Sequence, residues 1–153
     1  MRHGLRWFIV IVVIASVAVV WAQSQFGTAE EAKAMLQRAV EALKQDKGKA
    51  LASFNAGTDG FKDKDLYVFC WDLTTGLNAA NLNQPSLVGK AKITERKDAD
   101  GKEYGKEFLA KATEGSFNEV TYRFPRPGDP APVEKSSFVT KVGDMLCGVG
   151  YYK

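Results

Sequence analysis

The sequence predicts an α+β domain in which a long N-terminal helix packs on a central antiparallel sheet of about five strands. Three observations support this fold class. Apolar residues recur at helical spacing after residue 28, and an aromatic and β-branched run begins at residue 66. Three strand-like segments then follow one another at the C-terminal end. No internal repeat is found, so we expect a single domain.

The first helix is expected to begin at a capping box, with Thr28 as the N-cap and Glu31 three residues later. Apolar side chains then recur on one face and charged side chains on the other, which predicts an amphipathic helix of about five turns. We expect it to stop near Gly48 and to be followed by a short helical stretch over residues 49–55.

The middle of the chain changes from helical to strand period. Residues 66–72 are expected to form a buried strand, and residues 77–80 a short partner strand. A second amphipathic helix is predicted over residues 103–114, with Gly115 ending it. Its inward residues are expected to be Tyr104, Phe108, Leu109 and Ala112.

The C-terminal part is predicted to be a three-stranded meander. The expected strands are residues 116–124, 134–142 and 144–151. A proline-rich loop joins the first two strands, and Gly143 makes the tight turn between the last two.

The first 22 residues have the three parts of a cleavable signal peptide. Arg2 and Arg6 supply the positive start, residues 7–21 are uncharged and almost wholly apolar, and Ala22 ends the segment. The alternative is a retained anchor, although a spanning helix needs about 20 apolar residues. We therefore expect residues 23–153 to be periplasmic or secreted, with anchoring in the inner membrane by residues 7–21 as the alternative.

Charge and histidine content exclude several functions. Removal of the leader lowers the formal charge from +3 to +1 and leaves no basic cluster, so no nucleic-acid partner is expected. The only histidine, His3, lies in the leader, which excludes Ser-His and Cys-His catalysis and the usual imidazole metal sites in the domain. No spacing identifies an acid–base pair, so we expect neither an enzyme nor a metal or cofactor.

Several local strings, taken in order, resemble the single Cache domain of type 2, the extracytoplasmic sensor module of bacterial chemoreceptors and histidine kinases. The resemblance runs from about Thr28 to Lys153. The strings that carry it are Asp65–Phe69, Leu87–Lys90, Asp98–Lys102, Val120–Pro127 with the following Lys135, and Gly148–Tyr151.

The resemblance implies a PAS-like fold over residues 23–153, with a small-ligand pocket on the sheet face that often takes short carboxylates. Residues 74–81 differ from the Asp-Gly turn and His-Pro of relatives, so the ligand's identity does not carry over. Because the chain stops at Lys153, we expect an exported small-ligand-binding domain without an output module of its own. It would act through a membrane receptor or histidine kinase. The alternative is a ligand-free structural or interaction protein of the cell envelope.

The candidate ligand-binding residues combine one cation from the resemblance, three residues on predicted strands, and two asparagines that turn and loop roles explain equally well. Lys135 could meet a carboxylate at the sheet, or be a solvated strand lysine. Tyr122 and Arg123 are neighbours on one strand and point to opposite faces, so at most one lines a given pocket. The full set is Lys135, Tyr122, Tyr67, Arg123, Asn78 and Asn81.

The two cysteines leave two alternatives open. Cys70 and Cys147 could be buried free thiols or, in an oxidising compartment, a disulfide. The strand order implied by the resemblance makes their strands adjacent, which permits a cross-strand disulfide.

Overall fold

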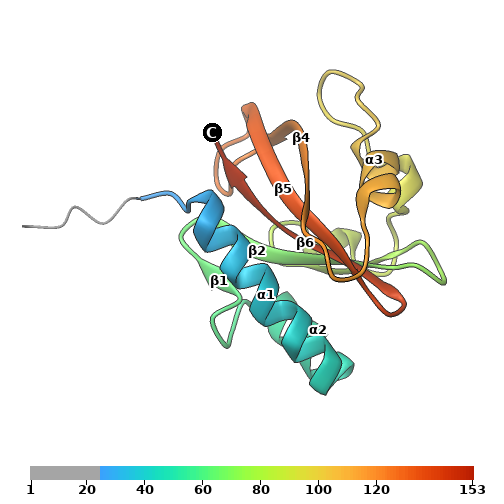
Figure 1. The fold of residues 1–153 in the computed structure, drawn as a ribbon. Helices are drawn as coiled ribbons and strands as arrows, with labels where there is room; N and C mark the ends of the chain where they lie inside the picture. Colours follow the sequence, from blue (N-terminus) through green and yellow to red (C-terminus); the bar gives the residue numbers. More distant parts are fainter. Residues whose placement is uncertain (1–24) are drawn as a thin grey trace, which may run out of the picture.

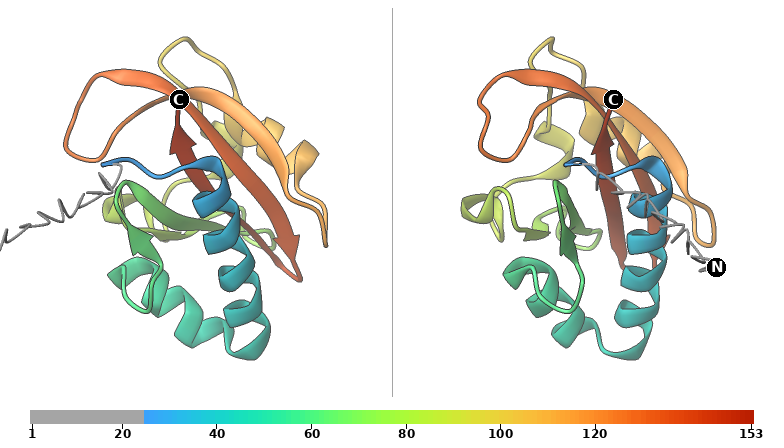
Figure 2. Two further views of the ribbon diagram at one scale, coloured as in Figure 1. Left: turned by 60° about the vertical axis from the view of Figure 1, so that its left-hand side comes forward. Right: turned by 90° about the vertical axis from the view of Figure 1, so that its left-hand side faces the viewer.

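The computed structural model describes residues 25–153, so the expected leader lies outside the described residues. Two helices, α1 and α2, cover one face of a twisted antiparallel sheet, and α3 with its preceding loops covers the other (Figure 1). Figure 2 shows this layering edge-on, with the sheet between α1 and the segment before α3. The helices are α1 (Ala29–Gln45), α2 (Lys47–Ala56), α3 (Tyr104–Lys111) and two short 3-10 helices, η1 (Pro85–Leu87) and η2 (Ile93–Glu95).

The sheet has six strands, in the order β1-β2-β6-β5-β4, and β3 pairs with β2. The predicted α+β class is therefore confirmed. Strand β1 has only two residues and was not predicted from the sequence. The strands are β1 (Lys62–Asp63), β2 (Leu66–Asp72), β3 (Asn78–Asn81), β4 (Asn118–Pro125), β5 (Pro132–Val142) and β6 (Met145–Tyr152).

The capping box at the start of α1 is present as predicted. The Glu31 amide donates to Thr28 Oγ1, and the Thr28 amide donates to the Glu31 carboxylate at 2.8 Å. The helix ends at Gln45, before the expected Gly48, because Asp46 takes an extended conformation and its side chain caps α2 through the amide of Lys49.

Helix α3 is shorter than predicted, and Gly115 does not end it. The chain leaves the helix after Lys111, because the Thr113 carbonyl accepts hydrogen bonds from the β5 residues Thr140 and Lys141. Gly115 lies in the turn that follows, at φ 77°. The expectation that Leu109 points inward is also wrong, since this side chain is exposed.

Alternate residues of the strands form two separate cores. The face toward α1, here called the α1 face, carries Leu66, Val68 and Cys70 from β2. The opposite α3 face carries Tyr67, Phe69 and Trp71, as strand parity predicts.

A disulfide lies within the α1 face. Cys70 of β2 and Cys147 of β6 are directly opposite each other in the antiparallel register and are joined, with both side chains fully buried. Of the two alternatives that the sequence left open, the structure has the cross-strand disulfide.

Candidate functional site

A small aromatic cavity lies on the α3 face, between the sheet and α3. Its volume of about 20 Å³ is enough for one water molecule. Side chains from β2 and β4 form its floor, while α3 and the irregular segment before it supply the cover. The lining residues are Tyr67, Phe69, Trp71, Asn81, Gln84, Arg96, Tyr104, Phe108, Tyr122 and Phe124.

Strand parity and α3 together concentrate aromatic rings at this place. Tyr104 of α3 stacks on Tyr122 of β4, with ring centroids 4.4 Å apart. Phe108, one turn later in α3, stacks on Phe69 of β2 at 5.5 Å. These contacts hold α3 against the sheet, so the cavity is walled mainly by aromatic rings.

Lys135 of β5 is buried beside this cavity, with only 1% of its surface exposed. Its ammonium lies in an aromatic cage formed by the rings of Tyr67, Phe124 and Tyr152, at 4.7 to 5.0 Å from each centroid. It donates a hydrogen bond to the Tyr67 hydroxyl at 3.2 Å. Tyr67 also lines the cavity, so only this side chain's width separates the ammonium from it.

No carboxylate in residues 25–153 forms an ion pair with Lys135. Burial therefore lowers the pKa of Lys135 to about 7, and the charge of Asp65 offsets only part of this shift. Cation–π contacts compensate some of the lost hydration. The result is a cation that is only partly stabilised by the protein itself.

Two glycines of β6 make this arrangement sterically feasible. A Cβ at Gly150 would overlap the Lys135 side chain and the Ser137 hydroxyl, and a Cβ at Gly148 would overlap the Phe69 ring. The absence of side chains at both positions lets Lys135 and Phe69 lie across β6. The Gly-Val-Gly string near the C-terminus is thus required by the packing around the cavity.

Two polar side chains, Arg96 and Gln84, also line the cavity. The Arg96 Nε donates to the Tyr104 hydroxyl at 3.1 Å. Gln84 Oε1 is buried and has no hydrogen-bond partner among the described residues. Gln84, Arg96, Tyr104 and Phe108 were not predicted from the sequence as cavity residues. Only the inward aromatic spacing of α3 gave a signal, because the segment before α3 has no period that orients its side chains.

The structure brings four of the six candidate residues together. Tyr67, Tyr122 and Asn81 line the cavity, and Lys135 lies directly behind Tyr67. The hydroxyls of Tyr122 and Ser137 are hydrogen-bonded at 2.9 Å, and burial raises the pKa of Tyr122 well above its usual value.

Asn78 and Arg123 lie elsewhere. Asn78 is buried, but its amide donates to the Cys70 carbonyl within the sheet and does not line the cavity. Arg123 points away from Tyr122, is half exposed, and donates to the Pro132 carbonyl at 2.7 Å. Neighbouring residues of a strand point to opposite faces of the sheet, so only Tyr122 of this pair reaches the cavity.

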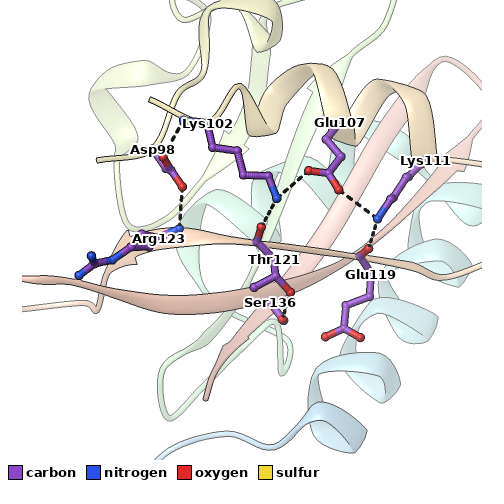
Figure 3. A network of polar contacts seen from close by, with 8 residues as sticks. All are labelled: Asp98, Lys102, Glu107, Lys111, Glu119, Thr121, Arg123 and Ser136. Atoms are coloured by element: carbon purple, nitrogen blue, oxygen red, sulfur yellow. Dashed lines mark hydrogen bonds and ion pairs between the residues drawn. The ribbon is translucent and has the colours of Figure 1, made fainter. Parts of the chain in front are cut away.

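Arg123 belongs to a polar network along the outer edge of β4, here called the edge network (Figure 3). Lys102 and Lys111 both pair with Glu107, at 2.8 and 3.0 Å, and each also donates to a β4 carbonyl. The Asp98 carboxylate accepts from the Arg123 amide at 3.0 Å. The network satisfies backbone groups of an edge strand that would otherwise be open to pairing with another chain.

A second hollow, here called the outer groove, lies on the other side of Tyr67. It has a volume of about 200 Å³ and is lined by the start of β2, the 82–83 loop and Pro127. Next to it, the Asp65 carboxylate accepts from the Gly27 amide at 2.7 Å and lies 3.6 Å from the Arg126 guanidinium. Tyr67 is the one residue that lines both hollows.

Neither a membrane-spanning helix nor a metal-binding cluster is found in the described range. The helices of residues 25–153 lack the combination of length and apolar character that a membrane crossing needs. The same residues contain no group of three or more His, Cys, Asp and Glu side chains that could hold a metal ion.

The chain belongs to the Single Cache domain 2 family, which it matches over residues 9–152. This confirms the resemblance found in the sequence. Cache domains are extracytoplasmic sensor domains, and the class of this protein is therefore a sensor domain. No curated protein matches the chain.

Three solved structures share the fold. A methyl-accepting chemotaxis protein from Vibrio parahaemolyticus RIMD 2210633 is 22% identical, with a TM-score of 0.66, over 80% of this chain and 86% of that one. The periplasmic sensor domain of a chemotaxis protein is 25% identical, with a TM-score of 0.60, over 80% and 88%. A Cache chemosensory domain characterised for carboxylic acid recognition is 24% identical, with a TM-score of 0.59, over 80% and 86%.

Proposed function

We propose that this domain binds a small carboxylate in the aromatic cavity and serves as an exported sensor-type module. The observation that carries the proposal is the buried ammonium of Lys135, which has no carboxylate partner among the described residues. A carboxylate ligand supplies the missing negative charge. The carboxylic acid recognition of one structural neighbour supports the same ligand class.

The ligand's carboxylate would lie against Tyr67, at the end of the cavity nearest Lys135. The Tyr67 hydroxyl accepts from Lys135 and can donate its own proton to a ligand oxygen. Charge-assisted hydrogen bonds in a dry site are stronger than neutral ones, and aromatic walls at Phe69 and Phe108 suit a short apolar tail. This arrangement suits the binding of one small anion.

The cavity must widen to admit a ligand larger than water. Tyr67 separates it from the outer groove, so rotation of this side chain would join the two hollows. Such a rotation would break the hydrogen bond to Lys135 while the ligand enters, and the bond would form again when Tyr67 closes over the bound ligand. Ligand binding and the position of Tyr67 are thereby coupled.

Residues 1–22 are proposed to be the signal peptide that exports the domain of residues 23–153. A membrane receptor or histidine kinase is the proposed partner, since related sensor domains belong to chemotaxis proteins. Measuring the N-terminal sequence of the protein secreted by its host tests the leader. A mature chain that begins at residue 23 is expected, and a retained leader would contradict this part.

Calorimetric titration with acetate and propionate tests ligand binding directly. We expect wild-type protein to bind at least one of them, and Lys135→Met to lose at least about tenfold in affinity, because a charged hydrogen bond contributes about 1.5–3 kcal/mol. Lys141→Met is the matched control, since Lys141 is an exposed lysine of the same strand. Equal binding by both variants, or no binding by wild type, would contradict the proposal.

The pH dependence of binding gives a second signature. Only protonated Lys135 attracts the carboxylate, and its pKa in the free protein is about 7. Bound carboxylate raises that pKa, so affinity should fall as pH rises above 7. An affinity that is constant between pH 6 and 9 would contradict the role of the Lys135 charge in binding. No binding at any pH would instead favour a ligand-free structural role, for which the small volume of the cavity is the supporting observation.

A further inference from the structure

The chain that leads into α1 is fastened to the sheet at residues 25–27, here called the N-terminal strap. The Gly27 amide donates to Asp65 Oδ1 at 2.7 Å, and this carboxylate is buried just before β2. Gly27 lies directly against Leu66, since a Cβ at this position would overlap the Leu66 side chain. The absence of a side chain at Gly27 therefore lets the strap reach the Asp65 carboxylate.

Arg126, in the loop between β4 and β5, completes the fastening. Its guanidinium lies 4.1 Å from the centroid of the Phe26 ring, and its Nη1 lies 3.6 Å from Asp65 Oδ2. Both of these atoms are buried and have no hydrogen-bond partner among the described residues. The contact between Arg126 and Asp65 is thus an ion pair without a hydrogen bond, and its strength depends on other charges nearby.

Lys135 supplies such a charge, because it shares an aromatic ring with Arg126. The Lys135 ammonium lies 4.9 Å and the Arg126 guanidinium 4.8 Å from the centroid of the Tyr152 ring, so the two cations are within about 10 Å of each other. Burial lowers the pKa of Lys135 and the charge of Asp65 opposes this effect. The Asp65 carboxylate therefore attracts both cations, while the cations repel each other.

We propose that the N-terminal strap responds to the charge at Lys135, so that neutralisation of this ammonium tightens the strap. Two effects act in the same direction. Loss of the ammonium charge removes a repulsion on Arg126, and it leaves Asp65 to interact with Arg126 and the Gly27 amide alone. The path from the ammonium to the strap passes only through Tyr152 and Arg126.

A bound carboxylate is the natural neutralising group, and the inference rests on the proposed carboxylate site for this point alone. The strap would then be held more tightly in the liganded domain. Because coupling between two sites is reciprocal, loosening of the strap would also weaken ligand binding. The Phe26 ring is partly exposed, so the state of the buried ammonium is communicated to the surface of the domain next to α1.

The test is hydrogen exchange of the Gly27 amide, followed by NMR at pH 6, below the Lys135 pKa of about 7. We expect Lys135→Met to slow this exchange by about threefold or more, the size expected for charges about 10 Å apart near a protein surface. Saturating propionate should slow it in the wild type. The Lys49 amide is the internal control, since it also donates to a carboxylate, that of Asp46, at 3.0 Å. Lys141→Met is the control variant.

Two further variants test the path. In an Arg126→Met background, Lys135→Met should change Gly27 exchange by less than about twofold, because the link between the two is gone. Phe26→Leu keeps an apolar side chain without a ring to stack on the guanidinium, and it should speed Gly27 exchange. Phe26→Tyr restores the ring and should restore the wild-type rate.

Unchanged Gly27 exchange in Lys135→Met, or an equal change at Lys49, would overturn the inference whether or not propionate binds. An undiminished response in the Arg126→Met background would also overturn it. If propionate fails to bind and Lys135→Met still slows Gly27 exchange, the carboxylate site is contradicted and the strap inference stands. The comparison of Lys135→Met with wild type uses no change at Arg126 or Phe26, so misfolding of those variants does not leave the inference untested.

Discussion

The two faces of the sheet are built from alternate residues of the same strands, yet they differ in what they bury. The α1 face buries apolar side chains and the disulfide of Cys70 and Cys147. The α3 face buries an ammonium, several hydroxyls and an unpaired amide oxygen around a small cavity. The α1 face therefore contributes most to stability, while the α3 face retains groups whose best partner is a ligand.

Removing the disulfide should have the largest effect on stability and little effect on the cavity. Its residues are separated by 77 positions, and loss of a native disulfide in a small domain typically costs about 2–5 kcal/mol. We expect the Cys70→Ala/Cys147→Ala protein to show this loss by chemical denaturation in the absence of reductant. At a temperature where it is folded, its carboxylate affinity should match the wild type, and a large loss of affinity would contradict the separation of the two faces.

Replacing Lys135 should raise the free energy of unfolding, whereas removing the disulfide should lower it. A buried charge without a counter-ion is costly, so Lys135→Met is expected to stabilise the unliganded protein by about 1–4 kcal/mol at pH 6. The measurement is the free energy of unfolding in denaturant, with Lys141→Met as the control. A destabilised Lys135→Met protein would mean that the aromatic cage stabilises the ammonium more than burial penalises it.

The pH dependence of stability follows from the titration of Lys135. The folded-state pKa of Lys135, about 7, lies below that of an unfolded lysine, so the unfolded chain binds more protons between these values. Wild-type stability should therefore rise from pH 7 to pH 9. Below pH 7 Lys135 is charged in the folded protein, so the full destabilisation from burying this charge should be present there. Lys135→Met should lack this rise. Above about pH 10 the buried tyrosines, whose pKa values are raised, act in the opposite direction.

Adding a side chain at Gly150 should lower stability by less than loss of the disulfide and by more than loss of the edge network. The added methyl group of Gly150→Ala overlaps Lys135 and Ser137, and overpacking of this kind typically costs about 1–3 kcal/mol. Thermal unfolding should show the loss, and carboxylate binding should weaken as well. Gly48→Ala, where the added carbon meets only an ordinary contact, should leave both properties nearly unchanged.

The edge network should contribute least to the free energy of unfolding. Its ion pairs are partly exposed, with about half of the Lys102 and Lys111 side chains accessible, and such pairs usually contribute at most about 1 kcal/mol. The Lys102→Met/Lys111→Met protein is expected to keep its carboxylate affinity and most of its stability. Static light scattering should show more self-association, because the β4 carbonyls lose their cover. A monodisperse double variant would contradict this protective role.

Sequence patterns predicted the fold well where an element has a regular period. The alternation of β2 placed Tyr67, Phe69 and Trp71 on one face, and the capping box located the start of α1. The end of α3 was mispredicted, because hydrogen bonds from β5 to Thr113, which lie far apart in sequence, end that helix. The candidate site was predicted in part, since strand parity separated Tyr122, on the apolar face, from Arg123 but could not show that a cavity lies on that face.

The sequence by itself determined which side chains share a face within each element, because side-chain direction follows from local backbone geometry. It also determined that residues 25–153 contain no histidine. Only the tertiary structure decided that Lys135 is buried without a counter-ion, that Gly150 makes room for it, and that Gln84 reaches the same cavity. Burial and pairing depend on which distant segments become neighbours, and no local pattern in the chain specifies that.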